Sequence, residues 1–253
     1  GLALACLTYF PLFQALTSAA NPDLARAQAT AQIVVQADPV TCSFQGSPIA
    51  REIDFTSACD IAKRTLAQNA ASYRNEALPS GEGARVQVGE TVIVAPNARI
   101  AAEGGRFEPA SVQAVAEFRR QVVEAMRAAG YPERADPAKL NKLEIVLILS
   151  VLVIYVTMVY GPIAATLVEL FPTRIRYTSM SLPYHIGNGW FGGLMPTIAF
   201  AMVASNGDIY HGLWYPIVVA AMTLVIGLIF IRETKDVDIY AKFLYWHPNR
   251  LSK

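Results

Sequence analysis

The sequence has few charged residues for its length. Asp, Glu, Lys and Arg make up only 16% of its 253 residues, and hydrophobic residues make up 53%, whereas a typical soluble domain carries roughly 25% charged residues. The 21 basic and 20 acidic side chains leave a net charge of +1, so the basic excess typical of a nucleic-acid-binding protein is missing. These absences disfavour an ordinary soluble enzyme and a partner made of nucleic acid.

Charged residues are wholly absent from three long stretches, 145–168, 177–207 and 209–231. Each is long enough for a membrane-spanning helix, which needs about 20 apolar residues. A fourth apolar run, 1–16, is shorter and has neither an initial Met nor a basic start. We therefore expect it to be the end of a longer transmembrane helix and not a signal peptide. The sequence predicts a protein whose membrane part consists of α-helices.

Short loops indicate the orientation, because Lys and Arg concentrate on the cytoplasmic side of a membrane. The loop after the first long stretch carries Arg174 and Arg176, whereas the next loop carries Asp208 and no basic residue. The sequence thus predicts a multi-pass protein of the inner (cytoplasmic) membrane, with a cytoplasmic tail at 242–253 and with residues 17–142 in the periplasm. Basic residues within such a long segment do not count against this orientation.

Most of the charge lies in one segment. Residues 23–142 hold 14 acidic and 14 basic side chains, which is 28 of the 41 in the chain. Hydrophobic spacing predicts a helix over 21–31, a strand over 33–35, a helix after residue 54 with Ala58, Ile61, Ala62 and Leu66 on one face, a β-hairpin over 86–94, and a helix over 109–130 with Val112, Val115, Phe118, Val122, Val123 and Met126 on one face. We therefore expect residues 17–142 to form a small α+β soluble domain, inserted ahead of the membrane helices in 143–241.

Catalytic motifs are missing from this segment. Residues 1–142 contain no histidine, no Gly-rich phosphate loop and no paired carboxylates at catalytic spacing. We therefore predict no enzyme activity, no catalytic residues, no metal and no cofactor.

Only three cysteines occur in the chain. Cys42 and Cys59 both fall in the segment that we expect outside the cytoplasm, where disulfides form and persist. A disulfide between them is our prediction, and the alternative is two free thiols. Cys6 lies in an apolar run and is interpreted as a packing residue.

A motif follows the first long stretch directly, Glu-Leu-Phe-Pro-Thr-Arg-Ile-Arg at 169–176. Together with Gly-Gly at 192–193 and Arg-Glu-Thr-Lys at 232–235, it resembles the C-terminal half of major facilitator superfamily transporters. The run 182–193, Leu-Pro-Tyr-His-Ile-Gly-Asn-Gly-Trp-Phe-Gly-Gly, is most similar to the metabolite:proton symporter family. One departure is Arg232, where related facilitators often have proline.

The resemblance implies part of a twelve-helix fold in which two six-helix halves rock around a central site. By it, residues 1–16 are the end of helix nine, 143–241 contain helices ten to twelve, and 17–142 fill the periplasmic loop between helices nine and ten. It also implies proton-coupled symport of small organic solutes, such as organic acids or compatible solutes. The implied partners are a small-molecule substrate, protons, the lipid bilayer and the remaining helices of the full-length transporter.

Polar side chains inside the long stretches are candidate substrate-binding residues, because such groups are costly in lipid and often functional. They are Tyr155 and Tyr160 in the first stretch, and Tyr184, His185, Asn188 and Trp190 in the second. Helical spacing places Tyr184 and Asn188 on one face. His185 could exchange protons or be a neutral packing residue, and the tyrosines could bind a carboxylate or simply pack.

The two glycines Gly189 and Gly193 are four residues apart. Such spacing removes side-chain bulk from one helix face and allows another helix to approach closely.

Four charged residues are predicted to lie at the cytoplasmic face: Glu169, Arg174, Arg176 and Glu233. In the resembled transporters this motif belongs to a network that holds the cytoplasmic ends together in one access state. The alternative is that the arginines only set the orientation. A different class of function also stays open, a membrane anchor for an extracytoplasmic ligand- or partner-binding module in 17–142, although an anchor alone would need neither these charges nor the polar positions.

Overall fold

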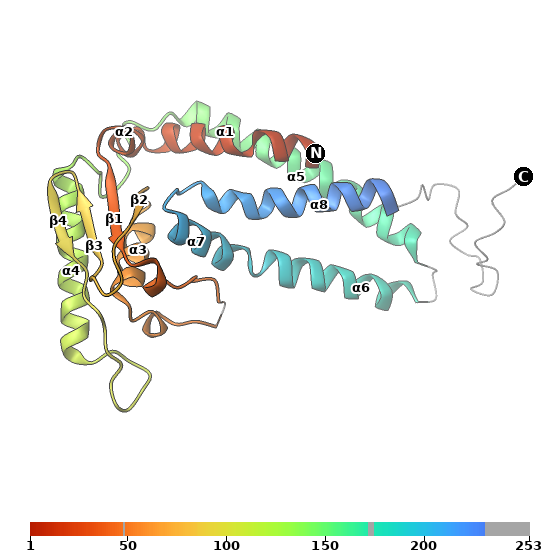
Figure 1. Ribbon diagram of the computed structural model, residues 1–253. Coiled ribbons are helices and arrows are strands. Elements are labelled where there is room, and N and C mark those ends of the chain that lie inside the picture. Colours follow the sequence, from red (N-terminus) through yellow and green to blue (C-terminus); the bar gives the residue numbers. More distant parts are fainter. Residues whose placement is uncertain (48, 172–174, 231–253) are drawn as a thin grey trace, which may run out of the picture. The chain divides into compact units, whose positions relative to one another are not determined.

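Figure 1 shows the computed structural model, which describes residues 1–47, 49–171 and 175–230. Within these residues, four helical segments are long and apolar enough to cross a membrane. They are α1 (Leu2–Ala20), α5 (Lys142–Leu170), the segment Arg176–Asn206, and His211–Phe230, which contains α8 (Trp214–Phe230). The predicted membrane helices are therefore present, and α1 continues four residues beyond the end that we expected for the first apolar run.

The third span is not one regular α-helix. It consists of α6 (Arg176–Ile186), a π-helix at Gly187–Gly192, and α7 (Met195–Asn206). Gly207 follows with a φ of +97°, a left-handed conformation that glycine adopts at low cost and that commonly ends helices. The chain then turns through the short 3-10 helix at His211–Leu213 into α8.

The chain forms two compact units. The first contains, of the described residues, 1–8, 149–194 and 216–230. Within it the start of α1 lies against α5, because a Cβ atom added to Gly1 would lie 3.0 Å from Cγ2 of Val159. The thiol of Cys6 lies 3.7 Å from the carbonyl oxygen of Ile217 on α8. Cys6 is thus a free, half-buried thiol between helices.

The second unit, 9–148 with 195–215, contains a four-stranded sheet in the order β2–β1–β3–β4. The strands are β1 (Ile33–Ala37), β2 (Arg74–Ala77), β3 (Arg85–Val88) and β4 (Thr91–Val94). β1 runs parallel to β2 and antiparallel to β3, and β3 forms the predicted hairpin with β4.

One face of this sheet is covered by two helices, α3 (Ala58–Gln68) and α4 (Pro109–Ala128), which share a hydrophobic core with the strands. Alternate strand residues point into the core, and the register pairs Val35 with Val86 and Val86 with Ile93. Leu66 and Val122 are fully buried between the helices and the sheet. Val112, which we placed on the buried face of α4, is instead 51% exposed, because Ser111 takes the buried position in that turn and accepts from the N–H of Arg99 at 2.9 Å.

The two ends of the segment that carries the sheet lie close together in space. The backbone N–H of Asn141 donates to the carbonyl of Ala19 at 3.0 Å, and the ammonium of Lys139 lies 2.6 Å from a carboxylate oxygen of Asp23. The hydrogen bond from Lys139 lowers the pKa of the Asp23 carboxyl. α2 (Pro22–Thr30) follows α1 directly, and Asn21 caps it by accepting from the N–H of Leu24.

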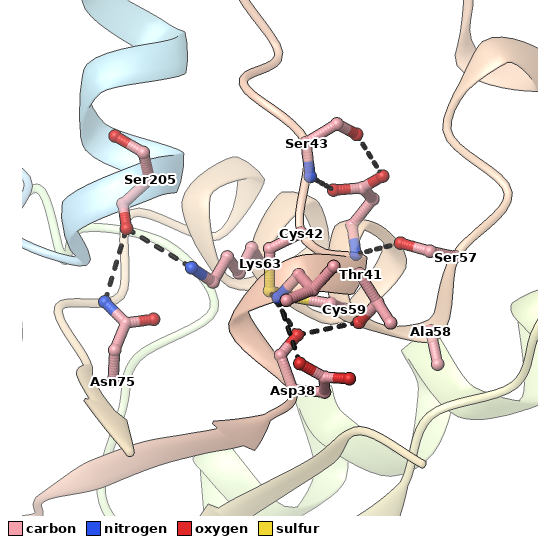
Figure 2. Close-up of a disulfide and its surroundings, with 12 residues drawn as sticks. Asp38, Thr41, Cys42, Ser43, Ser57, Ala58, Cys59, Lys63, Asn75 and Ser205 are labelled. Atoms are coloured by element: carbon pink, nitrogen blue, oxygen red, sulfur yellow. Dashed lines mark hydrogen bonds between the residues drawn. A yellow bond between two sulfur atoms is a disulfide. The ribbon is translucent and has the colours of Figure 1, made fainter. Parts of the chain in front are cut away.

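Cys42 and Cys59 form a disulfide, which is the pairing predicted from the sequence (Figure 2). It joins the turn after β1 to the first turn of α3, with a Cα–Cα distance of 5.2 Å. Ser57 caps α3 by accepting a hydrogen bond from the N–H of Asp60 at 3.1 Å. The carboxylate of Asp60 in turn accepts from the N–H of Ser43 at 2.8 Å, so the disulfide is flanked by hydrogen bonds that join the same two segments.

Candidate functional site

The third span contains a polar, irregular segment in its middle. At Gly187–Gly192 the helix is a π-helix, and the N–H of Gly193 donates to the carbonyl of Asn188, five residues back, at 2.9 Å. Pro183 precedes this segment inside α6 and has no N–H to donate. Single π-turns are rare and occur frequently at functional sites. Here the turn carries Asn188 and Trp190, and Tyr184 and His185 lie just before it at the end of α6.

The side chain of Asn188 is held by the helix itself. Its Nδ2 donates to the backbone carbonyl of Tyr184, four residues earlier, at 3.1 Å. The amide oxygen of Asn188 is the acceptor that this bond leaves to a solute or a neighbouring helix. α-Helical spacing would also place Phe191 and Met195 on this face, but the π-helix interrupts that spacing.

His185 has a defined hydrogen-bond arrangement. Its Nδ1 lies 2.7 Å from the backbone carbonyl of Ser181 and 3.2 Å from the hydroxyl of the same residue. A carbonyl oxygen only accepts, so Nδ1 carries the proton and the neutral ring keeps its lone pair on Nε2. Nε2 takes no part in this bond.

The other predicted substrate-binding residues have different surroundings. On α5, the hydroxyl of Tyr155 is hydrogen-bonded to that of Thr8 at 3.1 Å, whereas Tyr160 is 55% exposed. Trp190, in the π-helix, is 70% exposed. In the part of the chain that the structure describes, no hydrogen bond links either tyrosine to Tyr184, His185 or Asn188.

The two glycines of this segment differ in their surroundings. A Cβ atom on Gly193 would overlap the carbonyl oxygen of Gly189 one turn earlier, so the π-turn itself requires glycine there. A Cβ atom on Gly189 would meet nothing within 4 Å among the described residues. The close helix approach that we expected from their spacing is therefore not needed to explain Gly193.

Of the four predicted cytoplasmic charges, two lie in the described residues. Nε of Arg176 donates to the carbonyl of Phe171 at 3.2 Å and so connects the start of α6 to the residue that follows α5. Glu169 lies in the last turn of α5. Arg174 and Glu233 fall outside the described residues.

A further group of residues, which the sequence analysis did not find, lies at the end of α7. Lys63, Tyr73 and Asn75 come from α3 and from the start of β2, and all three donate side-chain hydrogen bonds to carbonyl groups at the end of α7. Their partners are about 130 to 142 residues away in the sequence. Local sequence patterns do not predict contacts between residues so far apart.

Comparison with known proteins gives short but consistent similarities. The chain is 38% identical over 76 residues to the glycine betaine/proline/ectoine/pipecolic acid transporter OusA of Dickeya dadantii, and 39% identical over 77 residues to a putative metabolite transport protein of Haemophilus influenzae. It is 36% identical over 76 residues to the proline/betaine transporter of Salmonella typhimurium.

These matches cover 30% of this chain and only 15–17% of the length of each relative. No family model matches the chain, and no solved structure matches it significantly. These relatives are transport proteins, which is the class of protein that the sequence motifs led us to expect. Over the matched stretch, the chain is similar to metabolite and proline/betaine transporters.

Proposed function

We propose that this chain is the C-terminal part of a proton-coupled secondary transporter for small organic solutes, either organic acids or compatible solutes, that works by alternating access. The observation that carries the proposal is the polar π-helical segment inside an otherwise apolar span, in a chain whose relatives are transporters. Groups of this kind in the bilayer face a cavity or a neighbouring helix, because lipid cannot satisfy them.

In this proposal, helix eleven is the span Arg176–Asn206. The amide of Asn188 orients the solute, and His185 exchanges a proton through Nε2 while its Nδ1 bond to Ser181 keeps the ring in place. Imidazole suits this role because its ordinary pKa lies near neutral pH. Tyr155 and Tyr160 of α5, with Tyr184 and Trp190, line the same cavity when the remaining helices are present.

The proposed location is the inner membrane, with residues 17–142 in the periplasm as an inserted domain. Three observations support it: the disulfide between Cys42 and Cys59 needs an oxidising compartment, the basic loop residues favour the cytoplasm, and the segment begins and ends where Asn141 bonds to Ala19. Because the two ends of this segment are neighbours, they fit a domain inserted between two helices that end at the same membrane face.

The test is uptake by the full-length protein in proteoliposomes, against a panel of organic acids and betaines, with and without an inward proton gradient. At least one solute should accumulate in a gradient-dependent way. His185→Ala and Asn188→Ala should lower uptake more than they lower the amount of protein in the membrane, and Thr223→Ala on α8, which loses a comparable intrahelical bond to Val219, should not. If no solute accumulates while purified residues 17–142 bind a ligand, the binding-module alternative replaces this proposal.

A further inference from the structure

Every backbone carbonyl in the last turn of α7 has a hydrogen-bond partner. The last four carbonyls of a helix have no partner in the regular α-helical pattern. At the end of α7, the N–H of Gly207 donates to the carbonyl of Val203 at 2.7 Å. The remaining partners come from the sheet-bearing segment: the hydroxyl of Tyr73 donates to Ala204, Nζ of Lys63 and Nδ2 of Asn75 each donate to Ser205 at 3.3 Å, and Nδ2 of Asn75 donates to Asn206 at 2.7 Å. Figure 2 shows Lys63 and Asn75 reaching Ser205 together.

The positive charge among these donors suits the C-terminus of a helix. A cation near the last turn of a helix interacts favourably with its dipole, and the ammonium of Lys63 lies there. Just beyond the helix, the backbone N–H of Tyr73 donates to the carbonyl of Gly207 at 2.8 Å. A Cβ atom on Gly207 would overlap the carbonyl of Tyr73 and touch its ring, so this glycine allows the two backbones to meet.

A second contact holds the side of α7. The guanidinium of Arg64, on α3, lies over the ring of Phe55 at 5.3 Å and over the ring of Phe200 at 5.4 Å. Phe200 belongs to α7, so Arg64 is shared between an aromatic residue of the sheet-bearing segment and one of the span. Cation–π contacts of this kind are attractive. Contacts at the end and on the side together define the position of the helix.

We propose that Lys63, Tyr73 and Asn75 form a clamp, through which residues 17–142 hold the outer end of helix eleven in place while the transporter works. The clamp binds the last turn of α7 in the same chain. Its role in transport rests on the proposed function, whereas the clamp itself rests on the contacts above. α7 follows the segment that carries Asn188 in the same span, so the clamp acts on the helix that comes directly after the candidate site in the chain.

The first test perturbs the clamp from the helix side. Gly207→Ala places a methyl group against Tyr73, and Gly81→Ala is a matched control, since Gly81 has a similar φ of +94° and would meet nothing within 4 Å among the described residues. Amide hydrogen exchange is measured on the full-length protein in lipid nanodiscs. In Gly207→Ala, exchange at Tyr73 and at residues 204–207 should accelerate together by roughly tenfold or more, as expected for losing two or more hydrogen bonds. Gly81→Ala should change neither.

The second test perturbs the clamp from the other side and leaves the glycine intact. Tyr73→Phe with Asn75→Ala removes donors to α7. Tyr131→Phe with Asn69→Ala removes the same groups where they donate to Ala31 and Thr65, within the sheet-bearing segment itself. Only the first pair should accelerate exchange at residues 204–207, and equal exchange in the two pairs would overturn the clamp.

Uptake measurements separate the clamp from the transport proposal. Gly207→Ala and the Tyr73/Asn75 pair should slow uptake severalfold relative to their matched controls at equal protein in the membrane. Normal uptake with accelerated exchange would refute the inferred role of the clamp in transport. Absence of uptake by the unmodified protein would refute the proposed function, and the exchange data would still decide whether the clamp exists.

Discussion

The disulfide between Cys42 and Cys59 is expected to stabilise the sheet-bearing unit by about 3 kcal/mol. The two cysteines are 17 residues apart, and closing a loop of this size removes roughly that much free energy from the unfolded state in the chain-entropy model. The bond joins the turn after β1 to α3, so its loss leaves these two segments to be held by the core and by the hydrogen bonds that Ser43 and Gln45 donate to Asp60.

Urea-dependent proteolysis of the detergent-solubilised chain measures this directly, because the protease cleaves the unit when it unfolds. Urea weakens a small domain by roughly 1–3 kcal/mol per molar, so reduction should lower the midpoint for cleavage within residues 17–142 by about 1–3 M. Cys59 is fully buried, and reduction therefore has to be carried out under partly denaturing conditions before refolding. Reduced wild type is the cleanest comparison, since Cys59→Ala also removes a core sulfur.

Two controls make the result interpretable. Cys6→Ala should leave the urea midpoint of the unit unchanged, because this free thiol lies in the other unit. Cys42→Ala combined with Cys59→Ala should match reduced wild type to within the cost of the lost core atoms. A midpoint that does not move on reduction would refute the reasoning about loop closure. Two thiols that can be alkylated without reductant would contradict the disulfide itself and weaken the periplasmic placement.

Two further predictions concern charge and pH. Arg174→Glu or Arg176→Glu should abolish most uptake, and adding Glu169→Arg or Glu233→Arg should restore part of it. The reason is that exposed ion pairs of about 0–1 kcal/mol can bias an access equilibrium without locking it. If the double variants are as inactive as the single ones, with topology verified by labelling, the arginines only orient the chain. Burial raises the pKa of the Tyr73 hydroxyl above its ordinary value of 10, so the stability that this neutral hydroxyl contributes is fully present below pH 10 and is lost as the pH rises towards the folded-state pKa. The difference in unfolding free energy between wild type and Tyr73→Phe should therefore shrink above pH 10 by up to about 1.4 kcal/mol per pH unit, and a difference that stays constant from pH 9 to 11 would contradict the burial of this hydroxyl.

The sequence predicts elements well where burial imposes a period. β1 and β3 alternate buried and half-buried residues, and α4 buries Val115, Phe118 and Val122 at helical spacing, so their patterns are visible without a structure. β2 has no such pattern. All four of its residues, Arg74 to Ala77, are exposed, and it forms because its backbone pairs with β1 at the edge of the sheet.

The candidate site is predictable in composition but not in geometry. Polar residues in an apolar stretch identify Tyr184, His185 and Asn188, because burial in lipid makes such residues costly. Their arrangement depends on a π-turn, and helical spacing alone assumes that every turn has the α-helical period. The clamp could not be predicted at all, since Tyr73 and Ala204 are 131 residues apart and each side chain in it is unremarkable in its local sequence.

The third span is held by many hydrogen bonds at the end of α7 and has irregular ones in its middle. This difference determines where the span can bend. The carbonyls at the end of α7 all have partners, so moving that end would break several hydrogen bonds at once. Around Gly187–Gly192 the regular α-helical bonds are already replaced, and Pro183 removes one more donor. Bending or turning the span therefore costs least in this segment. Asn188 lies within it and His185 just before it, so a solute or proton that binds there acts on the part of the helix that moves most easily.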